Sequence, residues 1–457
     1  MHPALTRIQR AIADTQFDGD VFLVGGAVRD ELMGRIASDD FDLVTRQSAP
    51  ELAQFLFDHK VSSIFPVIFE RFGTAMVEVD GVKIELVTAR KESYAKNSRK
   101  PVVQVGTYRD DAERRDFTIN TLMQSLRDEA IIDPLGTGKV DLENRVLKTP
   151  LDPVKTFDDD PLRMLRAVRF RWRFGLVPSK GLYDAIYMRR NRLKIISFER
   201  IRDELLKMLM HPTASDALDD LMKLGLFDII APEFKPMVKC EQGNYHHLDV
   251  WDHTRLVVHN ALQQGNKDEA LVLGALLHDV GKPPTRTIDE NGNTRFFCHE
   301  AIGAEMAQTI LFRWKIPSDD ISRVCALVKN HMRLGSAPVF TESAARRLIR
   351  DLGPNLQTLL QLVDADANAL KRGVRAFDLN QIRQTIEKVQ SATPAEKLIS
   401  PLTGQEIMEI TGLKPGKEVG EVKRMLDELV LDGELAPDDT AAAREFINAS
   451  HLRPESK

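Results

Sequence analysis

The sequence predicts an α+β fold, with a mixed sheet and helices at the N-terminus and helices over the rest of the chain. Short β-rich runs are confined to Val21 to Val105, where they alternate with one helical stretch near Ala49 to His59. From about Pro161 such runs almost disappear, and apolar residues recur at helical spacing. A sheet domain followed by a helical body is typical of the α+β class.

The length of the chain indicates several domains. Its 457 residues exceed one compact core, since single domains typically hold about 100 to 200 residues. Proline-containing breaks divide the sequence. We expect a head over residues 1–148, a helical neck over 149–225, a helical body over 226–385 and a helical tail over 386–457.

Composition excludes several classes of protein. Hydrophobic residues at 43% and charged residues at 29% are ordinary for a globular protein. No apolar run approaches the roughly 20 residues of a membrane span, and charged residues interrupt the first 17 positions, unlike a signal peptide. The three cysteines form no CxxC pair, which argues against a zinc knuckle or disulfide framework. We expect a cytoplasmic protein without membrane contact.

Charge is unevenly distributed along the chain. The net charge of −5 disfavours binding to nucleic acid, because phosphates require Lys and Arg. Residues 161–210, however, hold 13 Lys and Arg residues against 4 Asp and Glu residues. The sequence therefore predicts one basic face within an otherwise acidic protein.

The first β-rich run, Val21–Val24, leads through Gly25-Gly26 into a helical run. Glycine permits positive φ and leaves no side chain between backbone N–H groups and phosphate oxygens, while a helix N-terminus favours anions. A lone glycine pair is more often a tight turn. Followed closely by a carboxylate pair, it indicates a triphosphate site.

Asp40 and Asp42 stand two residues apart in the next strand and project to the same side. Paired carboxylates suit Mg²⁺. A hairpin with Asp80-Gly81 at its turn leads to a third carboxylate, Glu85. Three carboxylates around two Mg²⁺ ions would stabilise the attacking and leaving oxygens of an in-line displacement. An isolated pair is more often a solvated strand edge.

These motifs resemble a known family. "GGAVRDELMGRIASDDFD" is similar to the opening motif of tRNA nucleotidyltransferases and bacterial poly(A) polymerases, class II members of the polymerase β-like superfamily. The resemblance continues in order through "RRDFTIN", "DPLGTGKVDL", "DDPLRMLRAVRF" and "ISFERIRDEL". It implies a polymerase β-like head with metal ligands Asp40 and Asp42. It also implies a nucleotide site made of Gly25, Gly26, Arg29, Arg115, Asp116, Asn120, Asp160, Arg163, Arg166 and Arg169.

Asp160 and Arg163 are candidates for base selection. They lie three apart at the start of an expected helix and share a face. Arg donates and Asp accepts, which matches the ring nitrogen and amino group of cytosine and adenine. Uracil and guanine present the opposite pattern and would leave buried groups unpaired. In the resembling family this motif selects CTP and ATP, although its first residue is usually Glu, where this chain has Asp159. The alternative is an ordinary ion pair at a helix N-terminus.

The same helix continues as a basic stripe through Arg166, Arg169 and Arg173. Such stripes are usually solvated faces, but a second basic cluster follows closely. We interpret the two as an RNA backbone track. Its expected contacts are Arg173, Arg189, Arg190, Arg192 and Lys194.

A second series of residues resembles the HD phosphohydrolase superfamily. Its expected metal ligands are His253, His278, Asp279, His299, His331 and Asp366, with Asp364 as a rival for the last. Imidazoles around a bridging carboxylate would hold two transition-metal ions and generate hydroxide near neutral pH. Lys282 would steady a phosphate. A folded but inactive module is the alternative.

The expected function is template-independent addition of CMP and AMP to tRNA 3′ ends, with tRNA, CTP and ATP as partners. Hydrolysis of RNA 3′ or cyclic phosphates is the activity expected of the HD site. Alternatives are an A-adding enzyme, a poly(A) polymerase, or an HD phosphohydrolase that uses the head for RNA binding. The segment between Arg90 and Arg109 matches the flexible loop of CCA-adding and A-adding enzymes, which disfavours CC addition alone. Oligomeric state and HD metal stay open.

Overall fold

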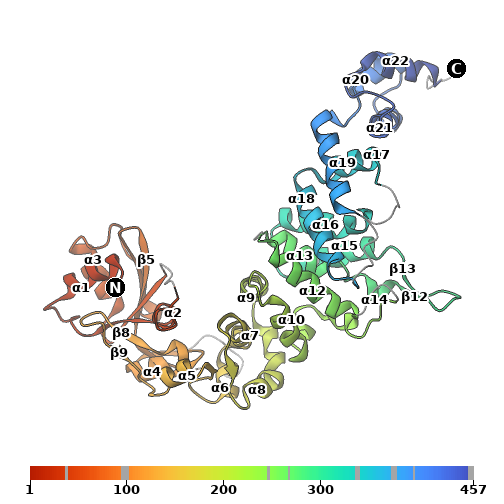
Figure 1. Ribbon diagram of the computed structural model, residues 1–457. Helices are drawn as coiled ribbons and strands as arrows, with labels where there is room; N and C mark the ends of the chain where they lie inside the picture. Colours follow the sequence, from red (N-terminus) through yellow and green to blue (C-terminus); the bar gives the residue numbers. More distant parts are fainter. Residues whose placement is uncertain are drawn as a thin grey trace. The chain divides into compact units, whose positions relative to one another are not determined.

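The computed structural model describes residues 1–35, 40–93, 102–243, 248–265, 268–334, 340–371, 378–394 and 397–450. The chain divides into two compact units, Met1–Pro232 and Glu233–Lys457 (Figure 1). The main sheet lies in the first unit, and the second is mostly helical, so the expected α+β class is confirmed. The first unit combines the expected head and neck, and the finer domain boundaries stay predictions.

The sheet of the first unit has seven strands in the order β3-β4-β5-β2-β1-β8-β9. The sheet is mixed: β2 and β5 are parallel, and all other neighbouring strands of the sheet are antiparallel. The strands are β1 (Val21–Val24), β2 (Phe41–Thr45), β3 (Val67–Phe69), β4 (Thr74–Val79), β5 (Val82–Thr88), β8 (Met123–Ser125) and β9 (Ile131–Ile132).

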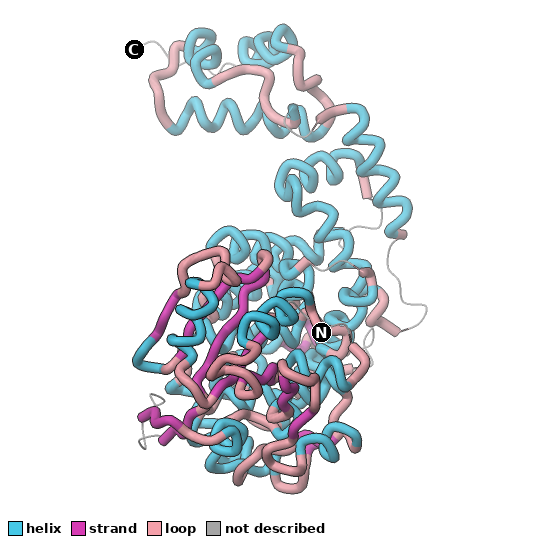
Figure 2. Tube along the Cα trace, turned by 90° about the vertical axis from the view of Figure 1, so that its left-hand side faces the viewer, coloured by secondary structure: helices cyan, strands magenta, loops and turns pink. Residues whose placement is uncertain are grey.

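Helices lie against the strands of the first unit (Figure 2). Among them, α3 (Ala49–Asp58) packs on one face of the sheet against β3, β4 and β5. Ser48 caps it by accepting a hydrogen bond from the Glu51 N–H, which satisfies one of the free donors of the first turn. Leu52 and Leu56, four residues apart, turn the same side of the helix to the sheet and are fully buried. The part of this face formed by β3, β4 and β5 is therefore covered by α3.

The β4–β5 hairpin turns at Asp80 and Gly81, whose φ angles are +52° and +80°. Two positive φ angles are the signature of a type I′ turn. The turn expected from the sequence is therefore confirmed, and it sets the register that places Glu85 in β5.

The rest of the first unit is formed by short strands and a series of helices. Residues 94–101, which belong to the expected flexible loop, lie outside the described residues. The elements are α1 (Pro3–Ile12), α2 (Gly26–Leu32), η1 (Glu70–Phe72), β6 (Arg90–Ser93), β7 (Val102–Val105), α4 (Tyr108–Glu113), η2 (Thr118–Asn120), α5 (Gly138–Glu143), β10 (Val146–Leu147), α6 (Pro153–Asp159), α7 (Leu162–Phe174), β11 (Val177–Pro178), α8 (Leu182–Arg189), η3 (Arg190–Ile195), α9 (Phe198–Leu209), α10 (Ala214–Lys223) and α11 (Phe227–Ile230).

The second unit is built around α13 (Glu269–Leu277), whose residues from Ala270 to Leu277 are all buried. A helix that is apolar all round belongs in a core, and α12, α16 and α18 pack against it. The surrounding elements are η4 (Pro232–Met237), α12 (Val250–Gln263), α14 (Lys282–Thr285), β12 (Arg286–Ile288), β13 (Thr294–Phe296), α15 (His299–Arg313), α16 (Ser318–Asn330), η5 (His331–Leu334), α17 (Glu342–Leu352), η6 (Gly353–Asn355), α18 (Leu356–Ala367) and α19 (Leu379–Ala392).

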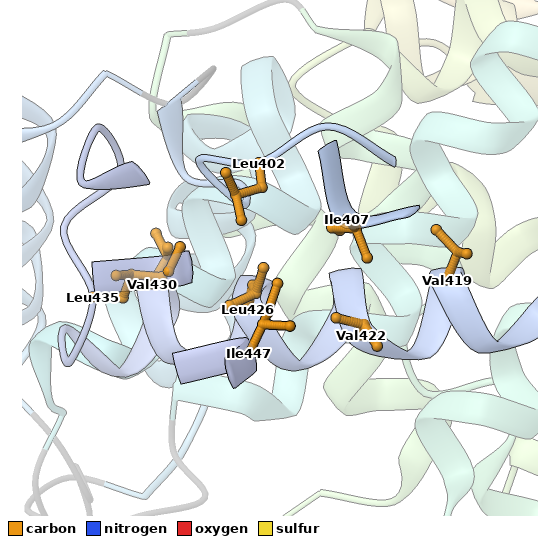
Figure 3. Close-up of a cluster of buried hydrophobic side chains, with 9 residues drawn as sticks. Leu402, Ile407, Val419, Val422, Leu426, Val430, Leu435 and Ile447 are labelled. Carbon is orange, nitrogen blue, oxygen red and sulfur yellow. The ribbon is translucent and has the colours of Figure 1, made fainter. Parts of the chain in front are cut away.

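The last three helices, α20 (Gly404–Thr411), α21 (Lys417–Asp432) and α22 (Thr440–Ala449), enclose a small core of their own (Figure 3). Val422, Leu426 and Val430 recur at helical spacing along α21 and meet Ile407 and Ile447. Within the described ranges, no helix combines the length and the apolar character that crossing a membrane requires.

Candidate active site and metal centre

The three expected carboxylates of the head meet through the register of the sheet. Asp42 is paired with Val24 of β1 on one side and with Glu85 of β5 on the other. Directly paired residues on adjacent strands share a face, and the strands lie about 4.8 Å apart. Asp40 precedes Asp42 by two residues, just before β2 begins. The two carboxylates of the paired strands are therefore neighbours on one face.

The electrostatics at Asp42 indicate a cation site. Burial raises the pKa of the Asp42 carboxyl to about 6, the Glu85 and Asp40 carboxylates add to the rise, and Arg115 opposes it. Like charges so close disfavour ionisation, and a divalent cation would relieve the repulsion. An all-oxygen donor set fits a hard divalent cation. Because Asp40 and Glu85 are exposed, ligands can reach this face from solvent.

Gly25 stands next to these carboxylates, between β1 and α2. Its φ is +78°, which is unfavourable for residues with a side chain. A Cβ atom here would lie 3.4 Å from Arg115 Nη1 and 3.5 Å from Asp42 Oδ2. Arg115 and Asp42 thus flank Gly25, and its positive φ, rather than a clash, is what requires glycine here.

Arg29, expected at the triphosphate, is buried in this structure. Its Nη1 donates to Asn120 Oδ1 at 2.6 Å and its Nε to Asp30 Oδ1 at 2.8 Å. The guanidinium carbon lies 4.2 Å from the centre of the Phe174 ring. Burial lowers the pKa of Arg29, against the pull of Asp30. Arg29 therefore fastens α2 to η2 and to α7.

Asp116, expected at the ribose, lies at the centre of a buried polar network. It accepts hydrogen bonds from Asn120 Nδ2 and Arg166 Nε, both at 2.8 Å. Burial alone would raise the pKa of Asp116, but Arg166 and Asn120 outweigh it and lower the pKa to about 2. Asp116 thus stays ionised and holds η2 against α7.

Glu204 of α9 completes this network and was not foreseen from the sequence. It is 4% exposed and accepts from Arg169 Nε at 2.6 Å and from Arg166 Nη1 at 3.4 Å. Buried arginines require such partners. Arg169 is therefore buried against a carboxylate and the half-buried Arg166 is paired with two, whereas Arg173 at the end of the expected basic stripe is exposed. A contact of Arg166 or Arg169 with nucleotide stays a prediction.

The two candidate base-selecting residues flank the break between α6 and α7. Asp160 ends α6, outside the expected helix, and Arg163 lies in the first turn of α7. Asp160 Oδ2 accepts from Arg200 Nη2 at 3.0 Å, and Arg163 Nη2 donates to the Arg114 carbonyl oxygen. Protein partners therefore orient both side chains. Arg200, within the quoted "ISFERIRDEL" motif, is a further residue that sequence reasoning missed.

The expected RNA contacts of the neck divide into paired and exposed groups. Arg189 Nε and Arg192 Nε each lie 3.2 Å from Asp158 Oδ1, so one carboxylate faces two cations. Arg190 lies 4.0 Å above the Tyr187 ring, and Lys194 is exposed. RNA binding by these residues stays a prediction.

In the second unit, Asp279 lies between two groups of histidines. Its Oδ2 is 3.1 Å from His278 Nε2 and 3.7 Å from His253 Nε2. Its Oδ1 is 3.6 Å from His299 Nε2 and 3.8 Å from His331 Nε2. Each group has its ligand atoms within 4.8 Å of one another. Asp279 is therefore placed to bridge two metal ions.

Backbone carbonyls orient three of these imidazoles. A carbonyl oxygen only accepts, so each Nδ1 carries the proton and Nε2 is presented toward Asp279. Burial lowers the pKa of His331 to about 3, with His278 the next cause, which keeps this imidazole neutral. The three pairs are His278 with Ala275 at 2.8 Å, His299 with Phe296 at 2.9 Å and His331 with Val328 at 2.6 Å.

Asp366, at the end of α18, lies 2.9 Å from His253 Nε2. Lys282 Nζ lies 2.7 Å from Asp279 Oδ2 and donates to Gln242 Oε1 at 2.6 Å. Gln242, buried at 7% exposure, carries no sequence signal of its own. Imidazoles with a shared carboxylate fit divalent transition metals.

Three family models match the chain. The Poly A polymerase head domain matches residues 21–148, and the HD domain matches residues 250–372. Between them, the probable RNA and SrmB-binding site of polymerase A matches residues 179–238. The order of the three matches follows the order of the sites described above.

Whole-chain comparisons agree with these matches. An A-adding tRNA nucleotidyltransferase of Deinococcus radiodurans is 34% identical over 92% of this chain and 94% of its own. A CC-adding tRNA nucleotidyltransferase of Thermus thermophilus is 31% identical over 93% and 92%. The crystal structure of the Bacillus stearothermophilus CCA-adding enzyme with CTP superposes with a TM-score of 0.70 at 21% identity, covering 98% of each chain, so the fold is shared.

Gly281→Ala should disrupt the His299 side of the metal centre. A Cβ atom there would lie 2.2 Å from the His299 carbonyl oxygen and 2.6 Å from the Gly303 nitrogen, so α15 must shift. We expect affinity for Mn²⁺, measured by calorimetry, to fall about tenfold or more. Gly420→Ala, where nothing lies within 4 Å, is the control. Wild-type Mn²⁺ binding by Gly281→Ala would contradict this geometry.

Asp42→Asn should change the pH dependence of stability. Because folding raises the pKa of Asp42 from 3.8 to about 6, the metal-free protein loses stability as pH rises through this window. In EDTA the variant should therefore melt above wild type near pH 8 but not near pH 4, and Mg²⁺ should remove its advantage. Scanning fluorimetry measures this. Glu31→Gln, exposed on α2, is the control, and equal melting of Asp42→Asn and wild type at both pH values would refute the raised pKa of Asp42.

Proposed function

Because this chain belongs to the tRNA nucleotidyltransferase family, we propose that it adds CMP and AMP to tRNA 3′ ends without a template and completes the CCA sequence. The observation that carries the proposal is the carboxylate face of the sheet, where Asp42 and Glu85 are paired beside Gly25. This arrangement suits transfer of a nucleotide from a triphosphate to a hydroxyl group.

In the proposed reaction the RNA 3′-hydroxyl attacks the α-phosphorus and pyrophosphate leaves. Asp40, Asp42 and Glu85 would hold Mg²⁺, which neutralises charge on the attacking and leaving oxygens. Gly25 admits the triphosphate next to the sheet, and Arg115 adds positive charge at the same place. The structure around these residues is fixed by backbone hydrogen bonds, so the donors need little rearrangement.

Base selection is proposed to reside in Asp160 and Arg163. Asp160 would accept from the exocyclic amino group of cytosine or adenine, and Arg163 would donate to the ring nitrogen. Arg200 and the Arg114 carbonyl hold the two side chains before nucleotide arrives. A pre-oriented pair loses less entropy on binding, which supports its use as a selective site.

Addition of AMP alone is the second candidate, and the 34% identity to the A-adding enzyme of Deinococcus radiodurans favours it. Against CC addition alone stands the loop segment between Arg90 and Arg109, although residues 94–101 lie outside the described residues. A poly(A) polymerase is disfavoured because "FERFGTAMVEV" lacks the basic segment of those enzymes.

For the second unit we propose hydrolysis of RNA 3′ or cyclic phosphates at the HD site, with a pair of divalent transition-metal ions held about Asp279. The match to the HD domain supports metal binding, and the two histidine groups on opposite oxygens of Asp279 support a pair. Both activities would serve the 3′ ends of tRNA in the cytoplasm.

The product series from one purified chain tests the proposal. We expect CTP and ATP together to extend tRNAs that lack the terminal adenosine, the last two nucleotides or the whole CCA, and extension to stop after CCA. Sequencing gels of the products, with each nucleotide supplied singly as a control, would show this.

If the chain extends only the tRNA that lacks just the terminal adenosine, it is an A-adding enzyme and the CCA proposal is wrong. Indifference to CTP and runs of adenosine would indicate a poly(A) polymerase. No incorporation by the wild-type chain would contradict the transferase assignment.

A further inference from the structure

One row of residues crosses the central sheet on the carboxylate face. Cross-strand partners share a face of a sheet, and each step along the row spans about 4.8 Å. From β1 to the edge strand β3 the row reads Val24, Asp42, Glu85, Met76 and Val67. The proposed catalytic carboxylates therefore stand in the middle of a continuous surface.

The two ends of this face differ in their cover. Over β1, β2 and β8 it is buried, with Phe22, Val44 and Met123 packed in one cluster beside Tyr108. Over β4 and β3 it is open, although its side chains are large and apolar. Met76 is 40% exposed, Val67 50% and Phe69 50%.

The opposite face of the same strands makes the contrast plain. There Ala75, Val77, Ile84 and Leu86 are at most 1% exposed, because α3 packs on this part of the sheet. A contiguous patch of exposed, large apolar side chains often marks a binding site. The open patch begins one strand away from Glu85.

The direction of the proposed reaction identifies what binds, so this step rests on the proposed function. In an in-line displacement the attacking and leaving oxygens lie on opposite sides of the phosphorus. Gly25, where the triphosphate is expected, lies on the β1 side of Asp42. The attacking RNA hydroxyl must then arrive from the other side, over Glu85 and Met76.

We propose that Val67, Phe69 and Met76 form the seat for the last unpaired nucleotides of the RNA 3′ end. Base faces are apolar and lie on such side chains without regard to sequence. Lys83, two residues before Glu85 on β5, is exposed on this face across from Glu78. In the proposed complex its ammonium group binds a phosphate of the RNA backbone. The seat holds an RNA end in place for attack and carries no base selection.

Arginine side chains lie where the seat ends. After Phe69 the chain enters η1, whose Arg71 and Phe72 line a pocket of about 540 Å³ together with Arg46 and Arg90. Two glutamates also line this pocket, and Arg46 Nε lies 2.7 Å from Asp20 Oδ1, so Arg71 and Arg90 are the arginines of the lining that balance the two glutamates. A phosphodiester leaving the seat would pass Arg71 and Arg90. The position of the seat, one strand away from Glu85 on the side from which the hydroxyl attacks, favours the RNA 3′ end over an acidic peptide or a second copy of this chain.

The test compares Val67→Glu and Met76→Glu with Ile131→Glu as the control. All three sites are exposed, and Ile131 lies on β9 at the opposite edge of the sheet, so the protein should fold in each case. With tRNA lacking the terminal adenosine, we expect the seat variants to raise KM for tRNA about tenfold. KM for ATP and the control should stay at wild-type values. Unchanged KM for tRNA in both seat variants would overturn the proposal.

A second readout does not depend on turnover. A tRNA whose last nucleotide is a photoreactive thiouridine should crosslink to the peptides that carry Val67 and Met76, as located by mass spectrometry. Crosslinks confined to α7 or α9 would overturn the seat. The seat would also be overturned if wild type were an oligomer in solution and Val67→Glu a smaller species, because the patch would then be an interface between copies of the chain. A wild-type chain that crosslinks here without incorporating nucleotide would refute the proposed function and retain the seat.

Discussion

The parallel pairing of β2 with β5 is the constraint on which the head depends. Main-chain hydrogen bonds force Asp42 and Glu85 to share a face, where burial, and after it the repulsion between the two carboxylates, raises the pKa of Asp42. The sheet holds the two carboxylates together despite their repulsion, and a bound cation would neutralise it. The glycine turn at Gly25, Arg115 and the open patch at Met76 are all arranged around this pair.

A second constraint is the cost of burying arginine. Within the first unit, Arg29, Asn120, Asp116, Arg166 and Glu204 form a continuous polar chain from α2 to α9. Removing one member of such a network leaves another charge buried without a partner, which is strongly destabilising. The network therefore ties the carboxylate face to the neck helices, and it gives the basic residues of α7 a structural role that a count of charges does not reveal.

Much of this was accessible from the sequence, for a physical reason. The β4–β5 turn and the Asp40 and Asp42 pair depend on local spacing, which is visible in a single chain. The histidine series, spread from His253 to Asp366, was expected from its resemblance to the HD superfamily. Glu204, Arg200 and Gln242 act through partners distant in sequence, so no periodicity marks them. The exposed patch at Val67 also escaped, because a β-rich run does not show which of its faces a helix covers.

Transfer of nucleotides at the carboxylate face is the central claim, and the rate of a single turnover on Asp42→Ala tests it most directly. With enzyme in excess over tRNA and CTP saturating, the account predicts that the rate of incorporation falls by at least about a hundredfold. The dissociation constant for tRNA should be unchanged, because the RNA contacts proposed for the neck and the sheet edge do not include Asp42. Incorporation at the wild-type rate would contradict the account and place the chemistry elsewhere.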